Sequence, residues 1–338
     1  MIPLKRIAVT VGEPGGVGPD LILNLAQRPF PGEVVVFGCP KNLHYRAKVL
    51  NLPIKFVEAD FLQPPQQNGN GLIRLYPIPL PKPQVLGYAD NVNRLQVLES
   101  LKTAFSFCME GLTQAIVTGP VQKSALNTLT EPFYGHTEFF ADLAQTKNIL
   151  MAFYHPKCIV GLLTTHIPLK LVPERITQER LTQAIHLLNT YLNRWFSRPS
   201  PRIIVLGLNP HAGEQGLFGT EEIEIIAPVI YDLQQQGINV HGPVSADTAF
   251  TPNTLDQADA ILALYHDQGL TPLKSFGFGN IVNITMGLPI LRASVDHGTA
   301  FALAGTKHVD TASFSSALQL AFALINQQEM HLCHPKNI

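Results

Sequence analysis

Charged residues are scarce in this chain of 338 residues: Asp, Glu, Lys and Arg together make up 14% of it, against about 25% in an average soluble protein. Apolar residues make up 46%. Because so few charges cover a water-exposed surface poorly, we expect part of the surface to be buried in an oligomer. The net charge of −1 provides no field that favours nucleic acid or a membrane as partner. Any anion binding must therefore be local.

Cysteine is also sparse, and no Cys-x-x-Cys pair or metal-ligand spacing is present. The four cysteines are Cys39, Cys108, Cys158 and Cys333. We expect buried or incidental thiols in a reducing compartment. The N-terminal residues lack the apolar region and cleavage site of a signal peptide, and no apolar run approaches the ~20 residues that span a bilayer. These absences predict a cytoplasmic protein.

Several catalytic and nucleotide-binding motifs are missing. There is no Gly-x-Ser-x-Gly nucleophile and no cysteine in an activating context, so covalent catalysis has no support. The glycine-rich residues 12–20 match neither Gly-x-Gly-x-x-Gly nor the P-loop. Glycines there allow the backbone to approach a ligand closely, and a tight turn between a strand and a helix is the equal alternative.

Strand-like and helix-like segments alternate along the chain, which predicts an α/β fold. The length favours two lobes. Residues 63–86 are rich in Pro, Gly and Gln, and we expect them to form a surface excursion. The strand-like runs are residues 6–11, 33–37, 115–118, 151–154, 158–164, 202–208, 258–264 and 281–285. The helix-like stretches are residues 41–50, 91–109, 176–195, 220–235, 298–304 and 312–326.

Three histidines, His166, His211 and His266, each lie just beyond one of these strand-like runs. If the three runs are neighbours in one parallel sheet, the imidazoles leave it at the same carboxyl edge, where open α/β sheets bind ligands. Three neutral imidazoles suit a divalent metal with a position left for substrate. The alternative is three unrelated histidines that cap strands. Glu214 and Asp267 are candidates to orient the rings.

Other polar residues suggest anion binding. A helix predicted to start at His136 and Thr137 has free N–H groups and a positive dipole, with a simple N-cap at Thr137 as the alternative. Lys274 and Arg292 suit phosphate or carboxylate, unless they are ordinary solvated charges. Asp247 lies in a predicted loop and is a candidate base, with a simple turn cap as the alternative.

Taken together, these motifs resemble the 4-hydroxythreonine-4-phosphate dehydrogenase family of vitamin B6 synthesis, nearly from end to end. One departure is Glu13-Pro14-Gly15, where the family usually has Asp-Pro-Ala, so the effect on cofactor preference stays open. The matching segments are residues 10–19, 118–123, 135–138, 165–169, 208–214, 242–248, 265–274 and 294–301.

The resemblance implies a two-lobed isocitrate/isopropylmalate dehydrogenase-like fold with three α/β/α layers and a nicotinamide site that is not of the Rossmann type. It implies a first lobe of residues 1–130 plus 290–338. Residues 131–289 would form a second lobe with the metal site and the dimer interface. The expected cofactors are NAD or NADP and one divalent metal, Zn, Mg or Co. The expected assembly is a homodimer whose active site is shared between subunits.

The resemblance also assigns roles to residues. The implied metal ligands are His166, His211 and His266, the last from the other subunit, and Lys274 completes the catalytic set. The implied substrate-binding residues are His136, Thr137, Lys274, Asn283 and Arg292. The implied cofactor-binding residues are Gly12, Gly15, His297, Gly298, Thr299 and Ala300.

The implied reaction oxidises 4-phosphooxy-L-threonine at C3 by hydride transfer to NAD+ or NADP+. Loss of CO2 then gives 3-amino-2-oxopropyl phosphate, a precursor for pyridoxal phosphate. A paralogue that oxidises erythronate or threonate 4-phosphate is the alternative within the family. A non-catalytic or acyl-transfer protein with an α/β nucleotide fold is the alternative from another class.

Overall fold

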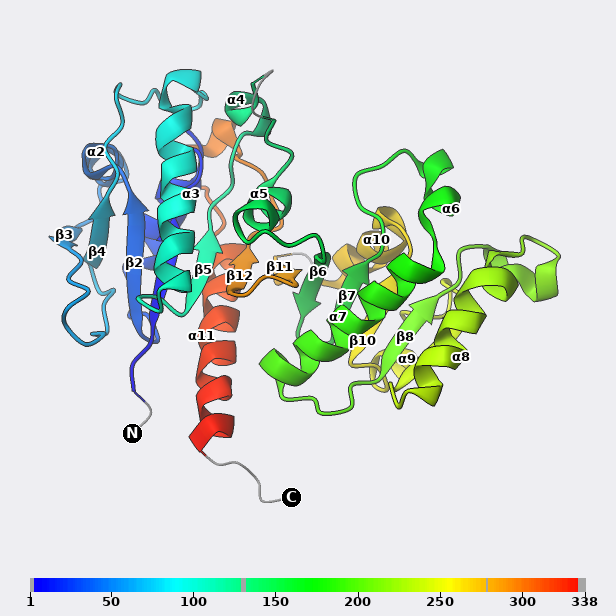
Figure 1. Cartoon of the computed structure of the whole chain (residues 1–338). Helices are drawn as coiled ribbons and strands as arrows, with labels where there is room; N and C mark the ends of the chain where they lie inside the picture. Colours follow the sequence, from blue (N-terminus) through cyan, green and yellow to red (C-terminus); the bar gives the residue numbers. More distant parts are fainter. Residues whose placement is uncertain (1–2, 129–131, 278, 334–338) are drawn as a thin grey trace. The chain divides into compact units, whose positions relative to one another are not determined.

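The computed structural model describes residues 3–128, 132–277 and 279–333, in which strands and helices alternate (Figure 1). The α/β class expected from the sequence is confirmed. The chain divides into two compact units. Unit 1 comprises Met1–Gln145 and Leu288–Ile338, and unit 2 comprises Thr146–Gly287.

The described residues of unit 1 form six parallel strands in the order β3-β4-β2-β1-β5-β12. The β-branched runs of β1, β2 and β5 are buried throughout, as expected for parallel strands covered on both faces. The strands are β1 (Arg6–Thr10), β2 (Glu33–Gly38), β3 (Lys55–Glu58), β4 (Leu72–Pro77), β5 (Ala115–Thr118) and β12 (Leu291–Ser294).

Helices α3 and α11 pack on the central strands of unit 1. The helices are α1 (Gly18–Leu25), α2 (Pro40–Val49), α3 (Arg94–Met109), α4 (Lys123–Leu126), α5 (His136–Leu143) and α11 (Ala312–Cys333), with short 3₁₀ turns η1 (Asn91–Asn93) and η5 (Phe301–Leu303). The helix predicted over residues 298–304 is wrong, because only η5 forms there. Ala300 has a φ of 42°, which a right-handed helix cannot accommodate.

The surface excursion predicted for residues 63–86 is also wrong in part. Strand β4 lies within it and pairs on one side with β3 and on the other with β2. Ile73 and Leu75 are buried while their neighbours are partly exposed. This alternation is short, and the prolines and glycines on both sides obscured it in the sequence.

The described residues of unit 2 form strands in the order β11-β6-β7-β10-β8-β9. Strand β6 is antiparallel to both of its neighbours, whereas β7, β10, β8 and β9 are parallel to one another. The strands are β6 (Leu150–His155), β7 (Cys158–Leu162), β8 (Ile203–Leu206), β9 (Val240–Val244), β10 (Ala260–Ala263) and β11 (Val282–Met286). The helices are η2 (Leu169–Leu171), α6 (Val172–Arg175), α7 (Gln178–Phe196), η4 (Glu222–Ile226), α8 (Ala227–Gln235), α9 (Pro252–Leu255) and α10 (His266–Gly277). The segment η3 (Pro210–Gly216) has a mostly left-handed backbone.

Helices α7 and α10 cover opposite faces of the unit 2 sheet. A side chain on Gly161 of β7 would lie 3.3 Å from Leu188 of α7. Its neighbours Val160 and Leu162 instead contact Gly269 of α10. Because successive strand residues point to opposite faces, the sheet lies between the two helices. The core on the α10 face includes Leu206, Ile261, Ala263, Leu270 and Leu273.

Within the described ranges, no helix combines the length and the apolar character needed to cross a membrane. Of the cysteines, Cys39 and Cys158 are buried free thiols and Cys108 is a half-buried one.

Candidate active site

The three histidine loops of unit 2 leave neighbouring parallel strands. Strand β10 pairs in parallel with β7 on one side and with β8 on the other. His166 follows β7, His211 follows β8, and His266 opens α10 directly after β10. All three histidines therefore lie beyond one carboxyl edge, and this part of the prediction is confirmed.

The structure brings His166 and His266 together, with 5.6 Å between their ring centroids. Two imidazoles on one tetrahedral ion have centroids about 5 Å apart, so this separation fits a shared ion. The ring of His266 is oriented by Asp267, whose Oδ1 lies 2.7 Å from Nδ1, as predicted. With Nδ1 engaged, Nε2 is the nitrogen that can bind a metal.

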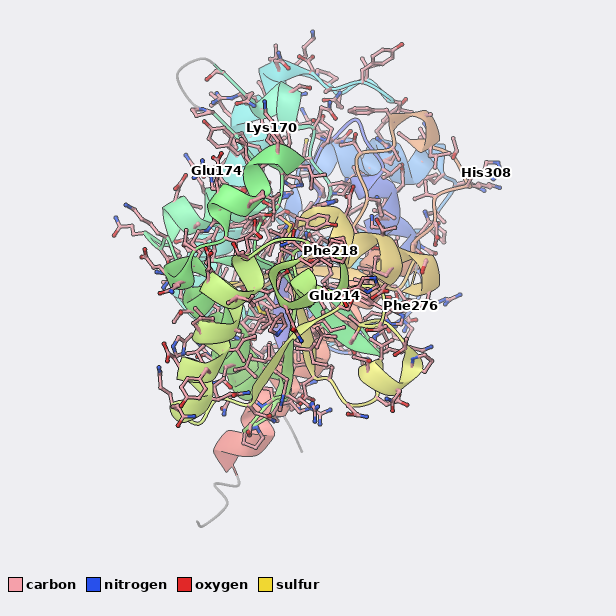
Figure 2. All side chains as sticks on the ribbon, turned by 90° about the vertical axis from the view of Figure 1, so that its right-hand side faces the viewer. Lys170, Glu174, Glu214, Phe218, Phe276 and His308 are labelled. Carbon is pink, nitrogen blue, oxygen red and sulfur yellow. The ribbon has the colours of Figure 1, made fainter. Side chains whose placement is uncertain are left out.

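His211 has different neighbours. Its ring centroid lies 6.3 Å from that of Phe218, and Figure 2 shows Phe218 and Glu214 on the same side of unit 2. A hydrogen bond from Ser245 and then the charge of His211 lower the pKa of Asp247. Across the described residues, no group of three or more His, Cys, Asp or Glu side chains could hold an ion. Metal ligation by His211 and orientation of a ring by Glu214 stay predictions.

The backbone around His211 is left-handed over five consecutive residues. Such a conformation costs roughly 1–2 kcal/mol for each residue other than glycine, so other contacts must hold it. The φ angles are 52° at His211, 51° at Ala212, 81° at Gly213, 42° at Glu214 and 56° at Gln215.

The buried carboxylate of Glu222 supplies those contacts. Its Oε1 accepts hydrogen bonds from the backbone N–H groups of Leu208 at 2.7 Å and Asn209 at 2.8 Å. Its Oε2 accepts one from Nδ2 of Asn209 at 2.9 Å. A side chain on Gly213 would lie 2.7 Å from Oε2, so the loop folds tightly over the carboxylate. Glu222 could not be recognised from the sequence, because its partners lie 13 and 14 residues away.

Unit 1 holds the predicted anion-binding residues Arg292, His136 and Thr137. Arg292 lies on β12, and its Nη2 donates to Oγ1 of Thr118 at 2.8 Å. Burial lowers the pKa of Arg292 to about 9, and the charge of Glu138 acts in the opposite direction. The guanidinium is therefore charged at neutral pH. Thr137 is buried in the first turn of α5.

His136, the first residue of α5, is held neutral. Burial lowers its pKa well below the usual value, and the charges of Arg292 and Lys123 act in the same direction. Its Nε2 is buried and has no hydrogen-bond partner among the residues that the structure describes. An incoming ligand can satisfy this atom, and the N-terminus of α5 favours an anion.

Lys123 is a cation that the sequence analysis missed. Its Nζ lies 3.6 Å from the position a Cβ would take on Gly135, and its charge acts on His136. The only sequence signal was its place in residues 118–123, a strand followed by a Gly-Pro loop. Unit 1 thus gathers two cations and a helix N-terminus, an arrangement that suits phosphate or carboxylate.

The two predicted cofactor segments lie together in unit 1. The N–H of Val17 donates to the carbonyl of Thr299 at 3.0 Å. A Cβ on Gly12 would lie 2.3 Å from the carbonyl oxygen of Pro120, and one on Gly15 would lie 2.0 Å from that of Tyr88. These two glycines are therefore required by the protein's own packing, which is the tight-turn alternative. Cofactor binding by Gly12, Gly15 and residues 297–300 stays a prediction.

A buried ion pair between Arg46 and Asp20 holds the backbone of the glycine-rich loop. Nη1 of Arg46 lies 2.5 Å from Oδ2 of Asp20, and both side chains are fully buried. Arg46 also donates to the carbonyls of Pro14 and Gly16, and Asp20 accepts from the N–H of Gly305 at 2.9 Å. The pair thus fixes the loop backbone and joins it to the segment that follows residues 297–300.

The remaining predicted substrate residues belong to unit 2. Lys274 lies on α10 two turns beyond His266, and Asn283 lies on β11 opposite Phe153 of β6. Both side chains are half-buried. Their contact with substrate stays a prediction.

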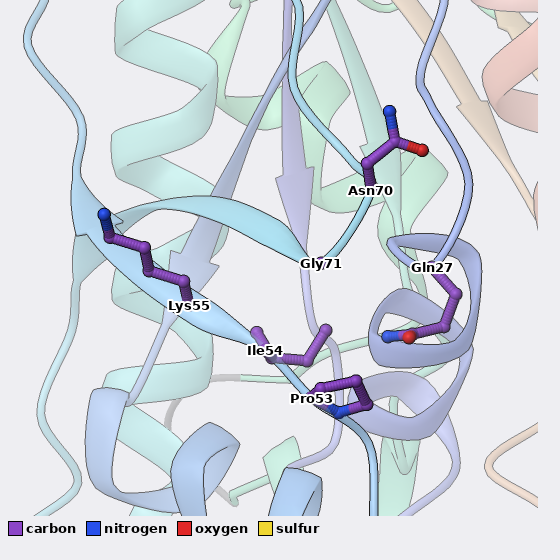
Figure 3. Close-up of a pocket in the computed structure, with 6 residues that line it drawn as sticks. All are labelled: Gln27, Pro53, Ile54, Lys55, Asn70 and Gly71. Carbon is purple, nitrogen blue, oxygen red and sulfur yellow. The ribbon is translucent and has the colours of Figure 1, made fainter.

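A surface pocket elsewhere in unit 1 contains none of the predicted site residues (Figure 3). It lies where β3 and β4 begin, at the amino ends of the parallel strands. Ligands of open α/β sheets bind at the other end, so this pocket is not our candidate. Its lining residues are Gln27, Pro53, Ile54, Lys55, Asn70 and Gly71.

Comparison with known proteins decides the family. The model of the pyridoxal phosphate biosynthetic protein PdxA family matches residues 31–321. This chain belongs to that family. It is 46% identical over 325 residues to the 4-hydroxythreonine-4-phosphate dehydrogenase of Shewanella frigidimarina, covering 96% of this chain and 99% of that protein. It is 48% identical over 322 residues to the enzyme of that name from Yersinia enterocolitica, covering 95% and 97%.

A solved structure supports the same assignment. The crystal structure of 4-hydroxythreonine-4-phosphate dehydrogenase from Klebsiella pneumoniae superimposes with a TM-score of 0.86 at 36% identity, over 94% of this chain and 99% of that one. The family resemblance seen in the sequence is therefore confirmed.

Proposed function

We propose that this PdxA family member oxidises 4-phosphooxy-L-threonine at C3 with NAD+ or NADP+ and releases CO2 and 3-amino-2-oxopropyl phosphate. The names of relatives that match nearly the whole chain support the dehydrogenase activity. The structural observation that carries the proposal is the placement of His166, His211 and His266 beyond one carboxyl edge.

Unit 1 binds an anionic group of the substrate. Arg292 and Lys123 provide positive charge, and the N-terminus of α5 provides backbone N–H donors at His136 and Thr137. Neutral His136 can accept a hydrogen bond from a protonated phosphate oxygen, or donate one to an ionised oxygen, through its buried Nε2. Lys274 and Asn283 of unit 2 complete the predicted substrate-binding set.

We infer that imidazoles of unit 2 are ligands of a divalent metal, and the 5.6 Å between the ring centroids of His166 and His266 supports this. When bound, such an ion lowers the pKa of the substrate alcohol and provides an electron sink for loss of CO2. The ligands are His166, His211 and His266, and all-imidazole ligation favours Zn or Co over Mg. Asp267 fixes the ring of His266 so that Nε2 carries the free lone pair.

The nicotinamide cofactor binds at the glycine-rich loop and residues 297–300 of unit 1. The hydrogen bond from Val17 to Thr299 supports this assignment because it joins the two segments. Buried Glu13, whose pKa burial raises to about 7, presents a partly protonated carboxyl near neutral pH. With Glu13 protonated, the loop therefore repels a dinucleotide phosphate less than it would with Glu13 ionised.

A homodimer is part of the proposal. Leu217, Phe218 and Ile223 form an exposed apolar surface beside the His211 loop, and Leu217 is 72% exposed. An apolar surface of this kind is typical of a protein interface. In the form implied by the family resemblance, His266 enters the partner's site. The 5.6 Å between the rings of His166 and His266 of one chain favours a second form, in which each chain uses its own His266.

A mixture of inactive variants separates the two forms. His166→Ala and His266→Ala chains, unfolded together and refolded, form mixed dimers. If His266 serves the partner, one site in each mixed dimer is intact, and about a quarter of wild-type activity returns for random pairing. If each chain uses its own His266, every site lacks one ligand and no activity returns.

The activity itself is tested by NAD(P)H absorbance with chelated and metal-restored protein. We expect turnover of 4-phosphooxy-L-threonine that returns with Zn or Co, and slower turnover of erythronate 4-phosphate, which lacks the amine. His166→Ala should fold normally and lose both bound metal and turnover. Full activity of the chelated protein would contradict the metal assignment, and preference for erythronate 4-phosphate would identify the paralogous reaction.

A further inference from the structure

Gln268 lies two residues after His266 in the first turn of α10 and is 8% exposed. Its Oε1 accepts a hydrogen bond from the N–H of Leu264 at 2.7 Å, and its Nε2 donates to the carbonyl of Gly207 at 2.7 Å. Leu264 follows β10 and Gly207 follows β8. One buried carboxamide therefore joins the ends of the two strands that lead to His266 and His211.

A second hydrogen bond extends this connection to the third strand. Oγ1 of Thr164, just beyond β7, donates to the carbonyl of Leu264 at 2.7 Å, and the N–H of Thr164 reaches the same carbonyl at 3.2 Å. The peptide groups of Leu264 are thus held on one side by Gln268 and on the other by Thr164. Thr164 and Leu264 each stand two positions before a predicted metal ligand.

This connection lies beyond the last paired residues of β10 and β8. The two strands pair up to Leu262 and Val205. Gly207 and Leu264 lie beyond that point, and the side chain of Gln268 bridges them. The link needs one donor and one acceptor at fixed positions, and the carboxamide of Gln268 provides both without charge.

We propose that Gln268 is a positioning residue that holds the strand ends from which the His266 and His211 loops leave. It contacts none of the reacting atoms and acts through the strand ends. The inference rests on the proposed metal-binding function, since the position of the strand ends affects ion binding only if His266 and His211 are ligands, in the site of their own chain or of the partner. Residues that orient metal ligands in this way typically change metal affinity about 10–100-fold when replaced.

Two substitutions at Gln268 test the proposal. Gln268→Met keeps the size and leaves both peptide groups unpaired, and Gln268→Glu places an acceptor against the carbonyl of Gly207. The matched control is Gln257→Met at an exposed glutamine of unit 2. Metal-free protein is titrated with Co²⁺, and the visible absorption spectrum reports both affinity and ligand geometry. We expect at least about 10-fold weaker Co²⁺ binding and a changed spectrum in both variants, and no change in the control.

Thr164→Val keeps the proposal testable if the Gln268 variants do not fold, because it removes one hydroxyl and retains the backbone bond. It should weaken Co²⁺ binding in the same direction and by less. Folded variants with the wild-type dissociation constant and spectrum would overturn the proposal. If wild-type protein itself gives no Co²⁺ spectrum that depends on His166, the metal assignment fails, and that result is distinct from a failure of Gln268 alone.

Discussion

The carboxylate of Glu222 accepts a hydrogen bond at 2.8 Å from the backbone N–H of Asn209, two residues before His211. The same oxygen holds the N–H of Leu208. These bonds anchor the start of the left-handed segment that carries His211. The acid is therefore part of the loop's structure, although it belongs to the π-helical turn η4.

Glu222→Gln should destabilise the protein by about 1–3 kcal/mol, because the amide turns a donor toward Nδ2 of Asn209 and loses the charge on its hydrogen bonds. Urea unfolding measures this change, and metal content after dialysis should also fall. Glu224→Gln, at an exposed position of the same turn, is the control. Equal stability of the two variants would contradict the anchoring role.

Arg292→Lys should raise the substrate KM by an amount equivalent to roughly 1–3 kcal/mol. Lysine keeps the charge and loses the planar group that contacts Thr118 and can bind an oxyanion with two parallel bonds. Steady-state kinetics with varied substrate measures the effect. Arg175→Lys at an exposed site should behave as wild type, and an unchanged KM and kcat in Arg292→Lys would exclude the assigned role.

His136 should make the protein less stable in acid. Burial and then the charges of Arg292 and Lys123 hold its pKa in the folded state well below 6.5. As the pH falls through 6.5, the unfolded chain takes up a proton that the folded chain refuses, so stability falls. The slope is at most about 1.4 kcal/mol per pH unit for one group.

Comparison of wild type with His136→Asn measures this contribution. The urea midpoint of the wild type should fall more steeply than that of the variant between about pH 7 and pH 5. Parallel midpoints would show that His136 titrates normally. Added inorganic phosphate should reduce the difference, because an anion at Nε2 stabilises the protonated ring.

Glu13 should make the protein less stable as the pH rises, which is opposite to the effect of His136. Burial, and to a smaller extent Asp90, raise its pKa to about 7 from 4.5, against a hydrogen bond from Gly15. The folded state therefore holds the proton more tightly. This contribution is fully present below pH 4.5 and is lost as the pH rises through about 7.

Glu13→Gln should remove that loss, which amounts to about 2.5 kcal/mol between pH 5 and pH 8. Urea unfolding at about pH 5 and pH 8 measures it: the wild type should lose more stability than the variant on going to the higher pH. Glu99→Gln, exposed on α3, controls for the change in net charge. If Glu13→Gln and wild type lose stability equally, the carboxyl is already ionised when buried.

The sequence predicted the α/β class and the shared edge of the three histidine loops, because each apolar run directly precedes its histidine and parallel strands end together. It did not predict β4, since its short alternation lies among prolines and glycines. It also missed that His266 begins a helix, because Gly269 and Pro272 weaken the helical pattern.

The supporting polar residues could not be found in this way. Gln268 contacts Gly207, 61 residues earlier in the chain, and Lys123 comes near His136 only when the loop after β5 and the start of α5 are folded. A single sequence carries no signal for such contacts. The left-handed backbone at His211 was equally hidden, since one glycine among five residues gives little warning of it.

The ion pair of Arg46 and Asp20 has a consequence for synthesis of the chain on the ribosome. The hydrogen bond from the N–H of Gly305 to Asp20 can form only after Gly305, 285 residues later, has been synthesised. Unit 1 therefore waits for its last segment, whereas unit 2 is one continuous stretch that ends at Gly287. The glycine-rich loop, near the beginning of the polypeptide, is among the last parts to reach its final conformation.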